Sequence, residues 1–347
     1  MTIARSEVFL RNWWYAIAWG TDIGRTTFAR TVCEEPVVLY RTEAGEVVAL
    51  EDRCCHRRLP LRMGQVIGDD LQCLYHGLLF NRDGVCIRIP GQDTVPSGAR
   101  VRAYPVAERH GLVWIFIGDP TKASEVEVPD YHWITDPNWG SRGAYFRVNA
   151  QYQLIVENLL DLTHLAFVHA TTIGNTAVVE GAQVQFRRTG DTVEVRRVMK
   201  NCDPPPTYVR AGGFKSKIDR WQFINFMPPG FVRLETGACN AGREGQQDVG
   251  RITLRNLNII TPETRTTTHY FWAQCHDFDP HNRKITDMLY QDVHTAFLQD
   301  VEVFENQQKN IALAPDAPEI DVKGDAGGLQ SRRIIHELLA RQRTGSS

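Results

Sequence analysis

The segment CCHRRLPLRMGQVIGDDLQCLYHG, residues 54–77, decides the fold. It contains Cys54-x-His56, then sixteen residues, then Cys73-x-x-His76. Each half places a thiol and an imidazole on one short loop at the end of an expected strand, so both pairs can face one metal site. Two cysteines and two histidines suit either a single zinc ion or a two-iron, two-sulfide cluster with both cysteines on one iron and both histidines on the other. Zinc sites typically use pairs of cysteines, whereas each pair here is mixed.

The surroundings of this segment predict a small all-β domain. Residues 36–50 read as a β-hairpin and residues 111–117 as a buried strand, with glycines and prolines breaking the chain between them. A polar segment flanked by prolines follows at 121–130. We therefore expect one domain over residues 1–120 and a second over residues 121–347.

The second part of the chain predicts a mixture of strands and helices. Residues 145–152 alternate like a strand, and residues 153–166 have a helical pattern. Strands with loops are expected over 178–274, including the glycine-rich stretch 237–250. The longest helical pattern covers 284–310.

Composition excludes several classes of protein. The 347 residues include 39 Lys and Arg against 41 Asp and Glu, a net charge of −2, which gives no reason to expect nucleic acid or an anionic membrane as a partner. No apolar run approaches the roughly 20 residues that span a bilayer, and the N-terminal stretch lacks a secretory pattern. The eight cysteines have irregular spacing, unlike a disulfide framework. We expect a soluble cytoplasmic protein.

A second candidate metal motif lies downstream. Asp161 and His164 are three positions apart, so they would share one face of a helix. His169 is five positions beyond His164 and would point about 140° away on a continuing helix. For both histidines to bind one iron, the helix must end or distort after His164. Two histidines and one carboxylate form the facial triad of non-haem iron oxygenases.

The carboxylate of such a triad must come from elsewhere in the chain. Asp300 lies beside the apolar stripe of the helix expected over 284–310, and a buried carboxylate needs a cation, a metal or good hydrogen bonds. On periodicity alone, a salt bridge to a buried arginine remains an alternative role for Asp300, and Asp292 remains a competing ligand.

The spacing C-x-H-x16-C-x2-H resembles the cluster motif of the Rieske non-haem iron oxygenases. The context C-L-Y-H-G at 73–77 agrees, and residues 157–169 resemble the family pattern E/D-x3-D-x2-H-x4-H. Cys54, rather than Cys55, matches the ligand position. One departure is Arg58, where many relatives have glycine after H-R, which affects the expected shape of the loop but not the four ligands.

The resemblance implies two metal centres. The [2Fe-2S] ligands would be Cys54, His56, Cys73 and His76. The mononuclear iron would be held by His164, His169 and Asp300, since A-F-L-Q-D-V-E-V at 296–303 resembles the family segment that carries the third ligand.

The resemblance also implies an α+β fold, with an N-terminal all-β Rieske domain and a catalytic domain whose antiparallel sheet wraps around helices. Relatives assemble as head-to-tail trimers. Asp161 would bridge the two centres across the subunit interface by accepting a hydrogen bond from a cluster histidine, His76, of the neighbour.

The implied function is that of a terminal oxygenase component. It would use O2 and electrons from an NAD(P)H-dependent reductase, of a flavin and iron–sulfur type. The chain is similar to the branch of vanillate demethylase, dicamba demethylase and toluene-sulfonate methyl-monooxygenase, which hydroxylates a methyl or methoxy carbon of an aromatic acid. Pocket candidates from the resemblance are Asn225, Asn258 and Gln291, and the acid group would be met by Arg233 or another arginine.

Alternatives remain at this point. Within the family, the substrate could be oxidised at a ring carbon or could be non-aromatic. Outside this function, the chain could be a zinc-stabilised binding module without redox activity, or an electron carrier whose C-terminal domain only binds a partner.

Overall fold

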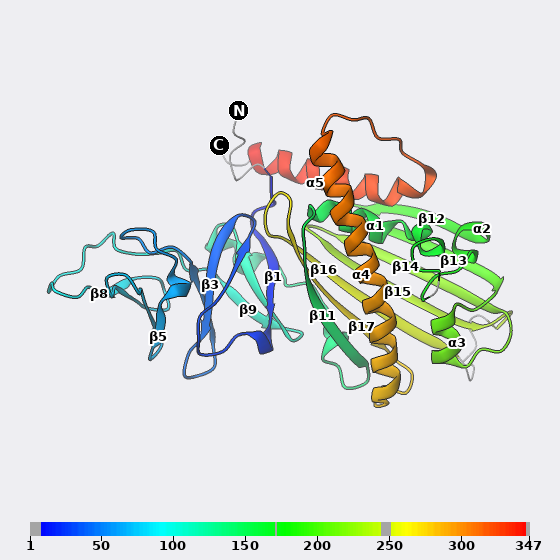
Figure 1. Ribbon diagram of the computed structural model, residues 1–347, viewed down its shortest axis with the longest axis horizontal. Coiled ribbons are helices and arrows are strands. Elements are labelled where there is room, and N and C mark those ends of the chain that lie inside the picture. Colours follow the sequence, from blue (N-terminus) through cyan, green and yellow to red (C-terminus); the bar gives the residue numbers. More distant parts are fainter. Residues whose placement is uncertain (1–7, 171, 244–250, 345–347) are drawn as a thin grey trace. The chain divides into compact units, whose positions relative to one another are not determined.

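The computed structural model describes residues 8–170, 172–243 and 251–344. The chain forms two compact units, Met1–Asp130 with Thr261–Thr264, and Tyr131–Ile260 with Arg265–Ser347 (Figure 1). The first unit extends past the expected boundary at residue 120, because the Trp14 indole donates a 2.8 Å hydrogen bond to the carbonyl of Val126. The expected boundary between the functional domains, at residue 120, stays a prediction.

The described strands of the first unit form three small antiparallel sheets. Their members, in sheet order, are β1 (Trp13–Trp19), β10 (Leu112–Ile117) and β9 (Val106–Arg109); β2 (Phe28–Val32), β3 (Glu35–Arg41) and β4 (Val47–Glu51); and β5 (Gln65–Ile67), β6 (Asp70–Gln72), β7 (Leu79–Phe80) and β8 (Cys86–Arg88). The predicted hairpin is confirmed as β3–β4, with Arg41 opposite Val47. The predicted strand at 111–117 is confirmed as β10.

The core of the first unit holds the two candidate ligand cysteines. Cys54 and Cys73 are buried among apolar side chains that include Tyr40, Leu50 and Phe80. Burial of this apolar surface fixes the ends of β4 and β6, from which the two ligand loops leave.

The second unit is built on one antiparallel sheet of seven described strands. In sheet order they are β11 (Gly140–Val148), β17 (Thr268–His276), β16 (Ile252–Pro262), β15 (Phe231–Asn240), β14 (Ile218–Met227), β13 (Thr192–Cys202) and β12 (Ala182–Thr189). The helices are α1 (Tyr152–Leu160), α2 (Ala177–Glu180), α3 (Pro206–Gly212), α4 (Arg283–Leu313) and α5 (Ala326–Thr344). Short 3₁₀ helices, in both units, are η2 (Gly20–Asp22), η3 (Leu61–Met63), η4 (Pro120–Glu125), η5 (His132–Ile134), η6 (Leu162–Ala166) and η7 (Lys323–Asp325).

Three helices pack on this sheet. In Figure 1, α4 runs along β11 and β17, and it contacts both strands. α1 contacts β14 and β15, and α5 contacts α1, β12 and β13. This confirms the expected α+β fold with an all-β N-terminal part and an antiparallel sheet wrapped around helices. Among the described helices, none is both long and apolar enough to cross a membrane.

Some predicted boundaries are wrong. The strand expected at 145–152 is β11, which begins at Gly140 and ends at Val148, and Tyr152 already starts α1. The helix expected over 284–310 is α4, and α5 was not expected from the sequence. Part of the glycine-rich stretch 237–250 lies outside the described residues.

Candidate metal centres

The two loops with the Cys/His motif share one backbone design. The amide of Cys54 donates to the carbonyl of Leu59 at 2.9 Å, and the amide of Arg58 donates back to the carbonyl of Cys54 at 3.0 Å. The second loop repeats the pattern, starting with the bond from the amide of Cys73 to the carbonyl of Leu78 at 2.8 Å. Each loop is therefore a closed turn that fixes its own Cys and His.

The fourth residue after each cysteine lies in the left-handed region. Gly77 has φ +71° and returns the amide bond to Cys73 at 3.1 Å, while Arg58 has φ +61° at the corresponding position. The left-handed conformation favours glycine because it has no Cβ. The departure at Arg58 therefore leaves the loop closed, at the expense of backbone strain.

Burial separates the cysteines from the histidines. Cys54 and Cys73 are each 2% exposed, whereas His56 and His76 are exposed, with ring centroids 4.6 Å apart. Burial raises the pKa of Cys54 to about 11, so a positively charged metal centre is needed to keep it as a thiolate. Both cysteines are free of disulfides. The set fits a cluster bound by inner thiolates and outer imidazoles.

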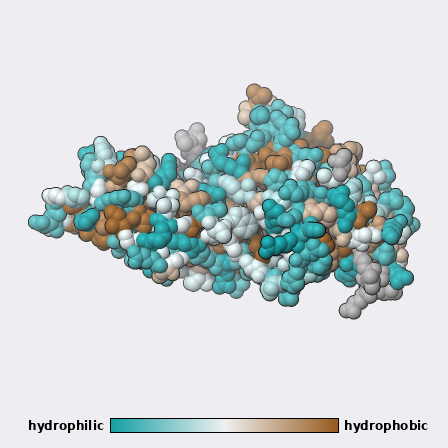
Figure 2. Space-filling model, turned by 60° about the horizontal axis from the view of Figure 1, so that its bottom comes forward, coloured by the Kyte–Doolittle hydropathy of each residue, from teal (hydrophilic) through white to brown (hydrophobic). Residues whose placement is uncertain are grey.

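Several exposed apolar side chains lie in or near the ligand loops in sequence, and the ring of Tyr75 contacts that of His76. Leu74 and Tyr75, inside the second loop, are 65% and 61% exposed, and Met63 and Ile87 are also exposed. Figure 2 shows hydrophobic side chains among the hydrophilic ones on the surface of the first unit. Exposed apolar residues of this kind are typical of a surface that meets another protein.

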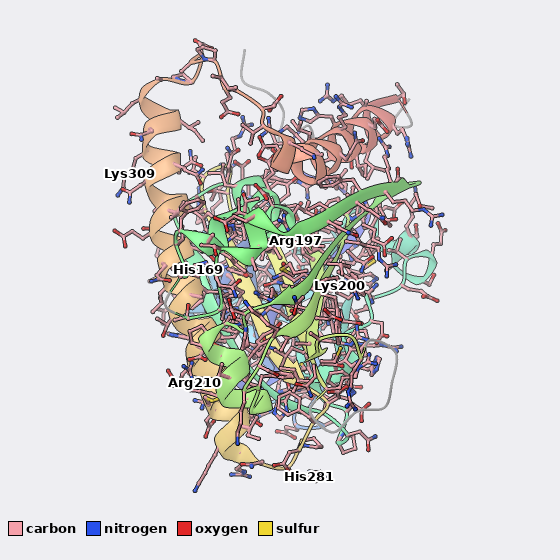
Figure 3. The ribbon with its side chains drawn as sticks, turned by 90° about the vertical axis from the view of Figure 1, so that its right-hand side faces the viewer. His169, Arg197, Lys200, Arg210, His281 and Lys309 are labelled. Atoms are coloured by element: carbon pink, nitrogen blue, oxygen red, sulfur yellow. The ribbon has the colours of Figure 1, made fainter. Side chains whose placement is uncertain are left out.

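His164, His169 and Asp300 form the second candidate centre. Nε2 of His169 lies 3.1 Å from Oδ1 of Asp300, and Nε2 of His164 lies 3.7 Å from the same oxygen. One ligand atom from each of the three residues lies within 4.8 Å of the others. Figure 3 shows His169 beside α4, the helix that carries Asp300. This is the donor set of a facial triad with open coordination positions.

The other ring nitrogen of each histidine is held by a hydrogen bond. Nδ1 of His164 lies 2.8 Å from the carbonyl oxygen of Asp161, and since a carbonyl only accepts, Nδ1 carries the proton. Nδ1 of His169 lies 2.8 Å from Oε1 of Gln299. When the imidazoles are neutral, these bonds leave each Nε2 with a lone pair for a metal, which is the usual arrangement of metal-binding histidines.

Electrostatics differ between the two rings. Burial lowers the pKa of His164, which favours the neutral imidazole that binds metals. Burial alone would also lower the pKa of His169, but its hydrogen bond to Asp300 and the charge of that carboxylate raise it. A metal ion bound by His169 and Asp300 would take the place of the proton that this pair of residues favours.

An interruption of the helix at Asp161 brings the two histidines together. α1 ends at Leu160, Asp161 has an extended backbone (φ −117°, ψ 103°), and His164 lies in the 3₁₀ helix η6. The carboxylate of Asp161 caps η6 by accepting from the amide of Thr163 at 3.0 Å. The expectation that Asp161 and His164 share one face of a continuous helix, distorted only after His164, is therefore wrong.

A largely apolar cavity opens on the triad. Its floor is the helix-covered face of the sheet, and α1, η6, the loop after η6, α3 and α4 supply the rest. The apolar lining consists of Leu159, Leu162, Leu165, Ile173, Tyr208, Leu234, Leu254, Leu289, Val293 and Phe297, and the polar lining of Asn158, His164, His169, Thr207, Arg220, Gln222, Thr236, Asn256, Gln274 and Asp300.

The pocket residues expected from sequence do not line this cavity. On β14 the lining residues are even-numbered, so Asn225 lies on the opposite face of the strand. Gln291 is exposed on the outer side of α4. Asn258 lies behind the lining, where its side chain donates to Oδ1 of Asn256 at 2.8 Å and accepts from the hydroxyl of Tyr270 at 2.6 Å.

The two other candidates also have different surroundings. Arg233 is not among the lining residues, and its guanidinium lies over the ring of Trp133. Asp292 pairs with Arg210 and accepts from the hydroxyl of Thr207, so it is separate from the histidine pair.

Sequence reasoning missed three polar residues of this site. Gln299 holds His169, and its position next to Asp300 was the available signal. Asn158 belongs to the quoted motif and lies with its amide nitrogen 3.5 Å from Oδ1 of Asp300. Arg220 lines the cavity from β14, where alternation alone gave no indication of which face is covered.

Comparison with known families covers both parts of the chain. Residues 13–105 match the Rieske [2Fe-2S] domain, and residues 148–341 match the vanillate O-demethylase oxygenase C-terminal domain. The match to a Rieske domain contradicts the zinc-stabilised, non-redox alternative. The cofactors are a Rieske [2Fe-2S] cluster and a mononuclear non-haem iron.

Individual relatives agree along nearly the whole chain. The iron–sulfur subunit of the toluene-4-sulfonate monooxygenase system of Comamonas testosteroni is 40% identical, covering 98% of this chain and 100% of that protein. A vanillate O-demethylase oxygenase subunit of a Pseudomonas species is 36% identical, over 91% and 98%. The crystal structure of dicamba monooxygenase with 3,6-dichlorosalicylic acid superposes with a TM-score of 0.90 at 28% identity, over 96% and 99%. The chain belongs to the Rieske non-haem iron oxygenases, as an oxygenase component whose catalytic domain is of the vanillate O-demethylase type.

Proposed function

We propose that this chain is the terminal oxygenase of a Rieske monooxygenase that hydroxylates a methyl or methoxy carbon of an aromatic acid. The observation that carries the proposal is the convergence of His164, His169 and Asp300 at the wall of an apolar cavity. The relatives named for toluene-4-sulfonate and vanillate support the substrate class, because both compounds are substituted aromatic acids.

The chain's residues would have defined roles. Cys54, His56, Cys73 and His76 would hold the cluster, and His164, His169 and Asp300 the iron. When bound, the iron supplies dioxygen activation and the cluster supplies electrons. Gln299 and the carbonyl of Asp161 keep the imidazoles in the tautomer that binds metal. The apolar lining binds the aromatic ring and excludes bulk water from the reacting carbon.

Asp161 would connect the two centres in a head-to-tail homotrimer. Its side chain is partly exposed (18%), and its carbonyl already contacts the ring of His164. We propose that its carboxylate accepts a hydrogen bond from the partner subunit's His76. On this chain His76 is exposed and so accessible to a neighbour. The electrons would come from an NAD(P)H-dependent reductase with flavin and iron–sulfur centres, in the cytoplasm.

A single-turnover experiment tests the proposed function. The purified protein, with both metal sites loaded, is reduced chemically and mixed with vanillate, methylbenzoates or methylbenzenesulfonates before oxygen is admitted. Products are identified by mass spectrometry. A demethylated phenol with formaldehyde indicates O-demethylation, and a benzylic alcohol indicates methyl hydroxylation. No reductase is needed, so its identity does not affect the result.

Other products would distinguish the alternatives. A ring diol would place the oxidation on a ring carbon, and no product from any aromatic acid would contradict the substrate class. An electron carrier without oxygenase activity predicts that His164→Ala changes nothing, whereas the proposal predicts loss of product with the cluster spectrum unchanged.

A further inference from the structure

Arg220 is a buried cation for which the described part of the chain supplies no counter-ion. It is 2% exposed, and one guanidinium nitrogen, Nη2, donates to the carbonyl of Ile173 at 3.2 Å. Among the described residues, its buried Nε and Nη1 atoms have no hydrogen-bond partner, and no carboxylate lies within ion-pair distance. A buried charge is costly unless it is paired, so this arrangement indicates that a ligand supplies the missing anion.

The other buried arginine nearby is paired differently. Arg197, on β13 (Figure 3), lies 3.5 Å from the carboxylate of Asp161 and donates to the carbonyl of Val178 at 2.6 Å. Arg197 also lies close enough to Arg220 for the two like charges to repel. That repulsion adds to the cost of leaving Arg220 without an anion.

Arg220 lines the same cavity as the candidate iron ligands. It lies on the helix-covered face of β14, as does Gln222, whose buried Oε1 also finds no partner in the described residues. The guanidinium carbon of Arg220 lies 4.9 Å from the centre of the Tyr208 ring, which holds the planar group against one wall. The remainder of the lining is mostly apolar.

We propose that Arg220 is the specificity-determining residue that binds the acid group of the substrate. A guanidinium forms strong charge-assisted hydrogen bonds with the oxygens of a carboxylate or a sulfonate. The apolar lining takes the ring, and the end of the ring away from the acid group meets the iron ligands. This inference rests on the proposed function for the identity of the ring. It assigns the acid contact to Arg220 and not to Arg233.

Binding to the iron-loaded holoprotein, without oxygen, tests the assignment. Two matched pairs of probes are titrated: 4-methylbenzoate against 4-methylbenzamide, and 4-methylbenzenesulfonate against 4-methylbenzenesulfonamide. The parent should bind at least one acid more tightly than its neutral partner. The pair with the larger ratio identifies the acid group that the cavity prefers.

Arg220→Gln should weaken binding of that acid by about 10- to 100-fold, the range for losing a hydrogen bond to a charged group. It should change binding of the neutral partner little. Arg220→Lys should retain part of the preference, because the positive charge remains. The other part should be lost with the planar, bidentate donor geometry of the guanidinium. Arg233→Gln is the matched control on the neighbouring strand and should bind like the parent. Cluster absorbance and iron content verify that each variant is folded and loaded.

Three results would overturn the inference: a parent that prefers neither acid, an Arg220→Gln variant that keeps the acid preference, or equal losses for acid and amide. The single-turnover experiment is independent of these outcomes. An acid preference that depends on Arg220, without any oxygenated product, would contradict the proposed function and leave the anion site standing. Normal turnover of acids by Arg220→Gln at parental KM would contradict the anion site and leave the proposed function standing.

Discussion

Nδ1 of His169 donates a 2.8 Å hydrogen bond to Oε1 of Gln299, the residue immediately before Asp300. The same turn of α4 therefore supplies a candidate ligand to the iron and the group that orients a second candidate ligand. Such outer partners fix the tautomer of a ligating histidine and typically contribute about 10- to 100-fold to metal affinity.

Removing this outer partner should weaken iron binding without touching the cluster. Gln299→Ala is expected to lower iron affinity by about 10- to 100-fold, because the His169 ring loses its fixed orientation. The measurement is iron retention against a competing chelator, with cluster absorbance as an internal reference. Leu298→Ala, at an exposed neighbouring position, is the control. Equal iron retention in both variants would show that Gln299 does not hold the ring in the loaded protein.

Asp161→Asn should separate electron transfer from metal binding. Asparagine can keep the cap on η6, since its side-chain oxygen still accepts from the amide of Thr163. The charge opposite Arg197 is lost, as is the charged acceptor proposed for the partner subunit's His76. We expect both centres to remain loaded and coupled turnover to fall by orders of magnitude.

The measurement for Asp161→Asn is the rate of cluster oxidation after substrate and oxygen are added to reduced protein. Asp161→Ala should in addition lose about 1 kcal/mol of stability, because the cap is removed. Parental oxidation rates in Asp161→Asn would contradict the bridging role.

Local spacing made the two metal motifs visible in the sequence. The cluster loops are each closed by bonds between near neighbours, such as Cys54 and Leu59, so sequence distance is a good guide to their geometry. Asp300 is different, because it joins His169 across 131 positions. Helical periodicity places Asp300 on a buried face but also leaves Asp292 as a candidate, and only the family resemblance chose between them.

The cavity could not be read from the sequence for a related reason. Gln222 and Asn225 lie three apart on one strand and therefore face opposite sides of the sheet. Which side is covered depends on where α1 and α4 pack, and this is a tertiary property. The break at Asp161 was missed because the leucines on both sides continue a helical pattern. The competing interaction is the hydrogen bond that the Asp161 carboxylate accepts from the amide of Thr163 in the next turn.

His56→Cys should lower the reduction potential of the cluster. A third thiolate adds negative charge to the centre and stabilises its oxidised form, and Rieske potentials exceed those of all-cysteine clusters by on the order of hundreds of mV. The measurement is a spectroelectrochemical titration of the holoprotein. Cys55→Ser, next to the proposed ligands and exposed, is the control and should leave the potential unchanged. An intact cluster with a parental potential in His56→Cys would mean that His56 is not a ligand.

Arg58→Gly should leave stability unchanged or raise it, whereas Gly77→Ala should lower it. Both positions have φ near +60° to +71° in equivalent loops, so glycine at 58 relieves strain of about 1 kcal/mol, partly offset by the greater freedom of glycine in the unfolded chain. Alanine at 77 adds that strain, and its Cβ would lie 2.9 Å from Cγ of Pro90. The measurement is denaturant-induced loss of cluster absorbance in the two variants and the parent. Arg58→Gly should lose its cluster at a denaturant concentration equal to or above that of the parent, and Gly77→Ala at a lower one. A marked loss of stability in Arg58→Gly would mean that the arginine side chain contributes a contact to this loop that outweighs its backbone strain.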